Sequence, residues 1–144
     1  MKKRRPSKYT KGIYIPVNED KYVQPKDRHM NRYPYPVYRS SWERELYKRL
    51  DFSSKVVFWS TESVGIPYVS PKDGKVHRYY PDIFIKTVDG KIYIVEVKPS
   101  RFQKDPVNVA KWGEARLYAE RIGAEFIVMT ENEFKRFGIA LDKS

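Results

Sequence analysis

The chain of 144 residues has no cysteine and only two histidines, His29 and His77. The absence of cysteine excludes disulfide bonds, thiolate nucleophiles and every zinc site that uses cysteine ligands. Two histidines are also too few for a histidine-rich metal site. The composition therefore excludes cysteine-based and histidine-rich metal sites.

A long hydrophobic run is also missing. The longest apolar stretch that resembles a strand, residues 92–97, already contains Glu96, whereas a membrane span needs about 18 or more apolar residues. Residues 1–7 are basic like the start of a signal peptide, but no apolar segment follows them. We therefore expect a protein that acts in the cytoplasm of the cell that makes it.

Acidic residues are scarce relative to basic ones, with 18 Asp and Glu against 29 Lys and Arg and a net charge of +11. Such an excess favours polyanionic partners, either nucleic acid or an acidic membrane surface. The excess is uneven, because residues 1–39 have a net charge of +8 and residues 40–144 one of only +3. The composition therefore divides the chain near residue 39.

We interpret residues 1–39 as an extended basic N-terminal arm, rich in proline and tyrosine, and residues 40–144 as one folded domain. Tyrosines among basic residues favour contact with a phosphate backbone or a partner surface. A solvated tail that keeps the protein soluble is the alternative. The residues expected to bind DNA are Lys2, Lys3, Arg4, Arg5 and Arg39.

From Ser40 onward the sequence has the pattern of a folded domain. Ser40 and Glu43 form a capping box, which predicts a helix from Ser40 to about Leu50. Turn residues and apolar periodicity predict the remaining elements: strands at 55–59, 64–69, 76–85, 91–97 and 125–129, and helices at 109–122 and 131–137. We therefore expect an α/β fold in which a mixed β-sheet is flanked by helices.

Three ionisable residues, Asp82, Glu96 and Lys98, interrupt apolar strands. Charges in such positions are costly unless they are paired or bind a metal. Glu96 and Lys98 are two residues apart, so their side chains leave the same face of one strand. A salt bridge at the sheet edge would explain them, but the proline before Asp82 and the hairpin spacing favour a catalytic site.

Whether Asp82 joins Glu96 depends on the register of the hairpin between them. A two-residue turn at 89–90 would pair Asp82 with Val97 and place the two carboxylates on opposite faces. A three-residue loop at 88–90, with Gly90 in the left-handed conformation, would pair Asp82 directly with Glu96. The sequence permits both registers, and we predict the second, which brings the Cβ atoms to about 4.5–5.5 Å.

This arrangement predicts metal-assisted hydrolysis of a phosphodiester bond. Asp82 and Glu96 would hold Mg²⁺ or Mn²⁺, with the backbone carbonyl of Val97 as a third ligand. The cation would bind a phosphate oxygen and lower the pKa of the attacking water. Lys98 would orient that water and neutralise charge in the transition state.

Pro81-Asp82 and Glu96-Val97-Lys98, in an α-β-β-β-α-β order, resemble the P-D…(D/E)-x-K nuclease superfamily. The resemblance implies a restriction endonuclease-like fold and a further carboxylate from the first helix. Glu43 matches that position, and Glu45 is the alternative. The capping box alone would also explain Glu43.

Further segments resemble the head completion nucleases of T-even-type bacteriophages: residues 38–43, 59–68, 78–82, 96–99 and 111–112. This resemblance implies a late-expressed nuclease that acts on packaged double-stranded DNA and is needed to join heads to tails. Its partners would be DNA and portal, neck or other virion proteins, with no membrane, and it would act in the host cytoplasm or on the virion. TnsA-type transposon endonucleases share much of the core pattern but are longer.

Two other functions compete with this interpretation. A junction-resolving nuclease is one, because the helix that carries Glu43 also resembles small archaeal resolvases. The other is a structural head–neck protein with a vestigial nuclease core, although all four expected catalytic residues, Glu43, Asp82, Glu96 and Lys98, are present. Glu62 is either a further acidic site residue or a solvated loop residue, and Gln103 is a weaker candidate.

Overall fold

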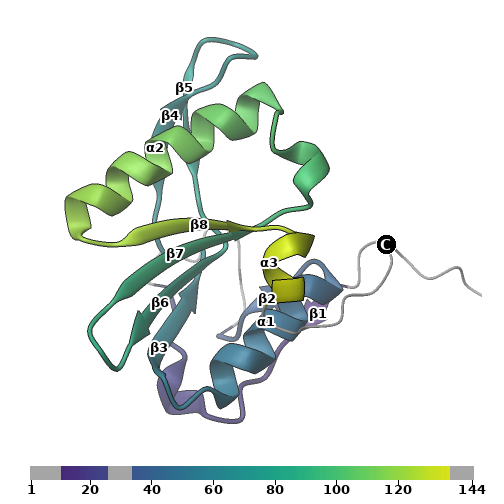
Figure 1. Cartoon of the computed structure of the whole chain (residues 1–144), viewed down its shortest axis with the longest axis vertical. Coiled ribbons are helices and arrows are strands. Elements are labelled where there is room, and N and C mark those ends of the chain that lie inside the picture. The colour runs from purple at the N-terminus through teal and green to yellow at the C-terminus, as the bar shows by residue number, and fades with distance from the viewer. Residues whose placement is uncertain (1–10, 26–33, 137–144) are drawn as a thin grey trace, which may run out of the picture.

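The computed structural model describes residues 11–25 and 34–136 (Figure 1). A mixed four-stranded sheet lies at its centre, in the order β3-β6-β7-β8. Its strands are β3 (Val56–Thr61), β6 (Ile83–Thr87), β7 (Ile92–Val97) and β8 (Glu125–Met129). β3, β6 and β7 are antiparallel to one another, and β8 is parallel to β7. The predicted α/β class with a mixed sheet is confirmed.

Two helices, α1 (Ser41–Phe52) and α2 (Pro106–Ile122), cover opposite faces of this sheet (Figure 1). The Ser40 side chain accepts the Glu43 backbone N–H at 3.1 Å, as the capping box predicted. α2 begins behind Asp105, whose side chain accepts the Val107 backbone N–H at 2.9 Å. None of the helices in the described ranges is long and apolar enough to span a membrane.

Each face of the sheet has its own core. On the α1 face, the short helix α3 (Glu131–Arg136) adds Phe134 to a cluster centred on Trp59, which is fully buried. On the α2 face, Trp112 and Ala115 pack with residues of β4 and β5. Val95 of β7 belongs to the first cluster, so the next residue, Glu96, is directed to the α2 face.

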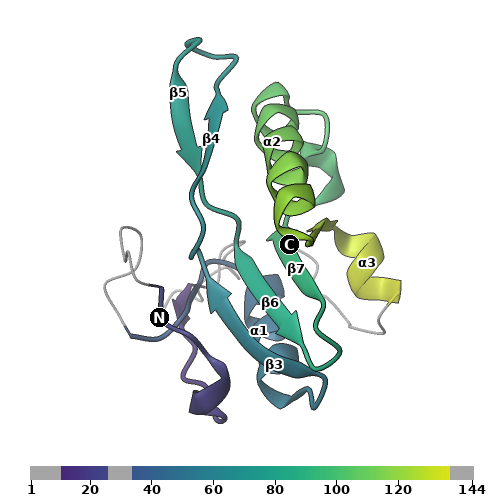
Figure 2. The same cartoon turned by 90° about the vertical axis from the view of Figure 1, so that its left-hand side faces the viewer.

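The hairpin of β4 (Ile66–Val69) and β5 (Val76–Tyr79) is separate from the central sheet and extends beyond it (Figure 2). The predicted continuous strand at 76–85 is therefore wrong. It breaks at residues 80–82, where Pro81 lacks the N–H that a central ladder requires. The predicted α-β-β-β-α-β order is kept by α1, β3, β6, β7, α2 and β8, with the β4–β5 hairpin inserted after β3.

The described part of the expected N-terminal arm packs on the domain. β1 (Gly12–Ile13) pairs with β2 (Val37–Tyr38), and a 3₁₀ turn, η1 (Glu19–Lys21), follows β1. The buried Asp51 carboxylate accepts the Tyr14 hydroxyl and the Val17 and Asn18 backbone N–H groups at 2.6–2.9 Å. An extended arm is therefore the wrong description of residues 11–25, because an acidic helix residue and the aromatic core hold them.

Candidate active site

A pocket of about 300 Å³ opens where β6 begins, β7 ends and α1 starts. Its walls come from the segment before α1, from both strands and from the turn after β7. The lining residues include all four side chains predicted to be catalytic: Glu43, Asp82, Glu96 and Lys98. Residues more than fifty positions apart in the sequence therefore meet in one cavity.

The β6–β7 register brings the two strand carboxylates together. Ile83 pairs with Val95, so Asp82 and Glu96 are the next opposed positions. The Thr87 backbone N–H donates to the Lys91 carbonyl at 2.9 Å, which closes a loop of three residues at 88–90, and Gly90 has a φ of 84°. The predicted register and the left-handed glycine are both confirmed.

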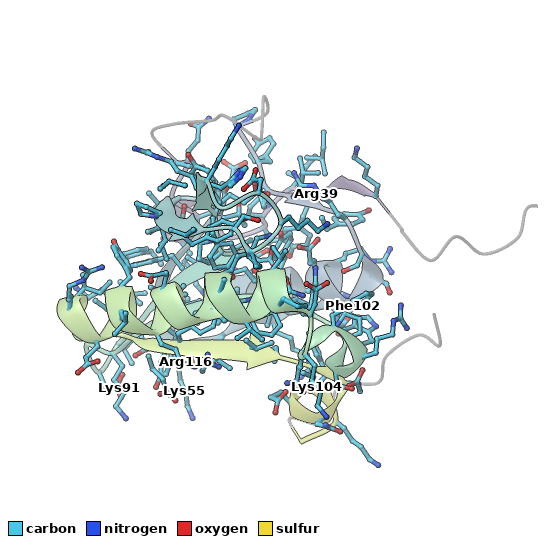
Figure 3. The ribbon with its side chains drawn as sticks, turned by 90° about the horizontal axis from the view of Figure 1, so that it is seen from above. Arg39, Lys55, Lys91, Phe102, Lys104 and Arg116 are labelled. Carbon is cyan, nitrogen blue, oxygen red and sulfur yellow. The ribbon has the colours of Figure 1, made fainter. Side chains whose placement is uncertain are left out.

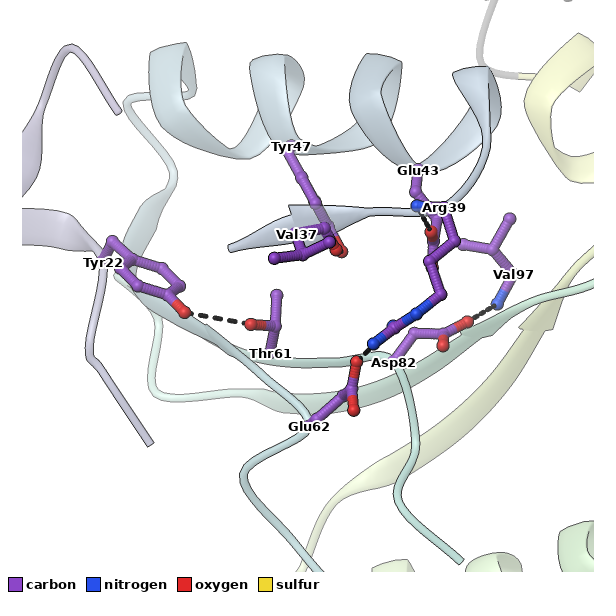
Figure 4. Close-up of polar contacts among 9 residues, drawn as sticks. All are labelled: Tyr22, Val37, Arg39, Glu43, Tyr47, Thr61, Glu62, Asp82 and Val97. Carbon is purple, nitrogen blue, oxygen red and sulfur yellow. Dashed lines mark hydrogen bonds and ion pairs between the residues drawn. The ribbon is translucent and has the colours of Figure 1, made fainter. Parts of the chain in front are cut away.

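Each strand carboxylate is oriented by one strong donor. The Val97 backbone N–H donates to Oδ2 of Asp82 at 2.8 Å (Figure 4). The Tyr79 hydroxyl donates to Oε1 of Glu96 at 2.8 Å. The second oxygen of each carboxylate makes no hydrogen bond within the part of the chain that the structure describes. The remaining oxygens are available to a ligand in the pocket.

Tyr79 was not predicted as a site residue. It ends β5, and its side chain is 4% exposed. In the sequence it is one of two adjacent tyrosines before Pro81, and nothing in that pattern distinguishes the one that contacts Glu96. The contact depends on the break between β5 and β6, which folds the end of β5 over the central sheet.

Glu43 approaches the pocket from the first turn of α1. Its side chain is buried at 6% exposure, and the Arg39 backbone N–H donates to Oε1 at 2.5 Å (Figure 4). Glu45 does not line this pocket and instead forms an ion pair with Arg49, at 3.6 Å, on the outer side of the helix. The structure therefore places Glu43, and not Glu45, with the strand carboxylates.

The three carboxyl groups have raised pKa values. Burial and the charge of Asp82 raise the pKa of Glu43 to about 8. Burial raises the pKa of Asp82 to about 6, against the opposing effect of the hydrogen bond from Val97. Burial, followed by the charge of Asp82, also raises the pKa of Glu96 well above its usual range. Because these carboxyl groups are buried and close to one another, binding of a proton or a cation is favoured over three free negative charges.

Lys98 supplies positive charge at the rim of the pocket. Its backbone N–H donates to the Met129 carbonyl at 3.0 Å, which anchors the end of β7 to β8. Its ammonium nitrogen lies 5.5 Å from the centre of the Phe102 ring. The charge of Lys98 lowers the pKa values of Asp82 and Glu96 and so favours the ionised form of both carboxylates.

Arg39, predicted to bind DNA, lines the same pocket but is already paired. Its Nη1 lies 2.5 Å from Oε1 of Glu62 (Figure 4). Glu62 has a φ of 50°, and its backbone N–H donates to the Asp82 carbonyl at 3.1 Å. The Glu62 side chain is only 11% exposed, so a solvated loop residue is the wrong description.

The other candidates are not brought into the site. Lys2, Lys3, Arg4 and Arg5 lie outside the described residues. Gln103 is exposed and does not line the pocket. The residues that meet in the pocket are therefore the four predicted catalytic ones, Val97, Arg39 and their immediate neighbours.

The two strand carboxylates fit a small divalent cation that takes only a few of its ligands from the protein. Within residues 11–25 and 34–136, no three acidic or histidine side chains are grouped closely enough to hold a metal by themselves. Mg²⁺ does not need such a cage, because it is usually bound by one or two carboxylates together with waters and substrate phosphates. Asp82 and Glu96 meet that requirement.

Comparison with known proteins agrees with this geometry. The chain is 29% identical over 150 residues to the head completion nuclease of Enterobacteria phage T4, an alignment that covers 88% of this chain and 95% of that protein. The family model described as TnsA-like endonuclease N terminal matches residues 53–131. The matched range contains Asp82, Glu96 and Lys98 and begins after Glu43. Because it spans more than half of the chain, the protein belongs to the TnsA-like N-terminal endonuclease family.

Proposed function

We propose that this protein is a divalent-metal-dependent deoxyribonuclease that hydrolyses phosphodiester bonds of double-stranded DNA. The observation that carries the proposal is the meeting of Glu43, Asp82, Glu96 and Lys98 in one pocket of a chain that belongs to an endonuclease family. A strand-edge salt bridge would not account for the buried Glu43, which comes from a separate helix.

Asp82 and Glu96 are the proposed ligands of Mg²⁺ or Mn²⁺, together with the carbonyl of Val97. A cation held there would polarise the scissile phosphate and lower the pKa of the attacking water. The Val97 N–H and the Tyr79 hydroxyl hold one oxygen of each carboxylate in place. The second oxygen of each carboxylate would then be available to the cation, with little reorganisation on binding.

Lys98 and Glu43 flank the proposed cation site. The Lys98 ammonium would orient the attacking water and stabilise negative charge that develops on the phosphate. Glu43, whose pKa is raised to about 8, can carry a proton at neutral pH in the metal-free protein. A neighbouring cation would favour its ionised form, which can accept a hydrogen bond from water.

The proposed setting is phage head completion, followed by the joining of heads to tails. Its support is the T4 relative, whose similarity covers 95% of that protein's length. We propose packaged DNA as the substrate and portal, neck or other virion proteins as partners, in the host cytoplasm or on the virion. The net charge of +11 suits a polyanionic substrate.

The test is cleavage of supercoiled and linear DNA by the full chain with Mg²⁺, with Mn²⁺ or with EDTA. We expect metal-dependent cleavage that Glu96→Gln and Lys98→Ala each reduce by roughly a thousandfold, since each removes charge stabilisation at the reacting phosphate. Glu45→Gln is the matched control, because it removes a carboxylate from α1 outside the pocket. It should retain wild-type cleavage.

Two outcomes would replace the proposal. DNA binding without cleavage under any metal would favour a structural head–neck protein with a vestigial core. Strong preference for four-way junctions over plain duplex would favour a junction-resolving endonuclease. Equal cleavage in EDTA would contradict the role of the metal.

A further inference from the structure

A second cavity, a groove of about 470 Å³, adjoins the active-site pocket. It lies between the β4–β5 hairpin and the N-terminal half of α2. Lys98 and Phe102 line both cavities, so the groove begins where the pocket ends. Anything long that occupies the pocket can therefore continue into the groove.

Three lysines follow the groove outward from the active site: Lys98, Lys111 and Lys72. Lys98 lies against Phe102, and the Lys111 ammonium lies 5.8 Å and 5.6 Å from the ring centres of Tyr68 and Tyr79. These ring contacts are cation–π arrangements, which hold the two ammonium groups at the wall of the groove. Lys72 lies at the exposed turn of the hairpin.

The acidic residues of the groove are already engaged by their neighbours. The Asp105 carboxylate caps α2 through the Val107 N–H. The Asp73 carboxylate accepts the Lys75 backbone N–H at 2.9 Å and lies 2.8 Å from Nε2 of His77. In the described part of the chain, no salt bridge involves Lys72, Lys98 or Lys111. The lysines are therefore available to an external anion.

We propose that this groove, between the β4–β5 hairpin and α2, binds the phosphate backbone of one strand of duplex DNA beyond the cleavage site. The inference rests on the proposed function for its substrate. The four residues of β5 span about 14 Å at about 3.4 Å per residue. Phosphates of one DNA strand are about 3.4 Å apart along the helix axis and farther apart along the backbone itself. A strand along the hairpin therefore passes about two phosphates, enough for Lys111 and Lys72 to contact separate ones.

The test compares two double variants of equal charge. Lys72→Gln with Lys111→Gln removes the two groove lysines that do not line the active-site pocket. Lys55→Gln with Lys91→Gln removes two exposed lysines from the opposite end of the sheet (Figure 3). Binding of each full-length variant to a fluorescent duplex, without metal, is measured by anisotropy over a range of salt concentrations.

Each lost phosphate contact should reduce the slope of log K against log salt by about 0.9. We expect the groove variant to lose about two units of slope and the control variant none. Between 50 and 200 mM salt, the affinity of the groove variant should therefore fall by a factor roughly ten times smaller than that of the control variant. If Lys111→Gln disturbs folding, Lys72→Gln alone should still reduce the slope by about one.

Equal slopes for the groove and control variants would overturn the inference. The outcome is independent of cleavage. A protein that cleaves DNA with an unchanged slope contradicts the groove alone. A protein that never cleaves, but shows the expected slopes, contradicts the proposed nuclease and retains the groove as a DNA-binding surface.

Discussion

The two β-hairpins in the described part of the chain follow one another in sequence and have opposite surroundings. The β6–β7 hairpin lies inside the central sheet, where α1 covers one face and α2 the other, and Ile83 and Ile94 are each 1% exposed. The β4–β5 hairpin stands outside that sheet, and every residue from 71 to 78 is exposed. Residues 80–82 join the two, at the edge of the active-site pocket.

This difference in burial determines how costly a charged side chain is in each hairpin, and therefore what its presence indicates about function. In β6–β7 an ionised side chain loses water, so Asp82 and Glu96 persist only with donors and a counter-charge. In β4–β5 a lysine remains hydrated, so its charge costs little free energy. The presence of Lys72 therefore indicates nothing by itself, and only its position in the groove favours a role in binding. The buried hairpin holds reacting groups in a fixed geometry, whereas the exposed hairpin presents charge to a large partner.

Of the substitutions that distinguish the two hairpins, Tyr79→Phe should have the largest effect on cleavage, because Tyr79 of β5 contacts Glu96 of β7. Its hydroxyl donates to Glu96 and lowers the pKa of that carboxyl. Loss of this orienting partner should reduce cleavage about 10–100-fold. It should also shift the pH profile to higher pH, since Glu96 would hold its proton more tightly. Steady-state cleavage rates from pH 6 to pH 9 measure both effects.

Tyr68→Phe is the matched control, since it removes a hydroxyl from the same hairpin without touching Glu96. It should retain the rate and the pH profile. A Tyr79→Phe protein that loses activity equally at every pH would instead have lost fold or substrate binding. The hydroxyl would then have no role in setting the charge state of Glu96.

Much of the buried hairpin could be predicted from the sequence. The sequence permits two registers, and the predicted one, with a three-residue loop and a left-handed Gly90, is the register in which Asp82 opposes Glu96. Glu43 could be placed at a helix start through its capping box. These features form within one hairpin or at the start of one helix. Local sequence patterns can therefore predict them.

The features that the sequence did not predict depend on long-range packing. The pairing of Arg39 with Glu62 joins the segment before α1 to the end of β3. The docking of residues 14–18 on Asp51 joins the N-terminal segment to the end of α1. A polar, proline-rich stretch has no periodicity that reveals such partners, because its hydrogen bonds are made to a surface formed by other elements.

Alanine at the left-handed glycine of each hairpin gives the second test. Gly90 has a φ of 84° and Gly74 one of 68°, and a Cβ at either position would meet no atom within 4 Å. The cost is therefore conformational, about 1–2 kcal/mol at each position. Gly90→Ala should also reduce cleavage, since its loop sets the register of the carboxylates. Gly74→Ala should leave cleavage unchanged. Urea unfolding and cleavage rates test the two expectations.

Gly113→Ala serves as the control for this pair. Gly113 lies within α2, where a Cβ likewise meets nothing within 4 Å, so alanine should stabilise the protein by about 0.5–1 kcal/mol. Equal loss of cleavage in Gly74→Ala and Gly90→Ala would contradict the separation of the hairpins. It would mean that the exposed hairpin also determines the geometry of the reacting groups.

The smallest expected effect is the pH-dependent stabilisation of the buried hairpin by a cation. The folded-state pKa values of Glu43, about 8, and Asp82, about 6, are raised above those of ordinary carboxyls. The protonated forms therefore favour the folded state, and the metal-free protein loses stability as pH rises from about 4 to 8. A divalent cation binds the ionised forms, so its stabilisation should grow with pH.

At tenfold excess of Mg²⁺ over its dissociation constant, we expect a stabilisation on the order of 1 kcal/mol at pH 8 and clearly less at pH 6. The melting temperature with Mg²⁺, compared with Na⁺ at equal ionic strength, measures it. Glu43→Gln removes one of the three carboxyls with raised pKa values and should flatten the pH dependence, whereas Glu45→Gln on the outer side of α1 should preserve it. A cation effect that is equal at both pH values would show that Mg²⁺ binds elsewhere, because protons compete with the metal in this range at a site of buried carboxyls with raised pKa values.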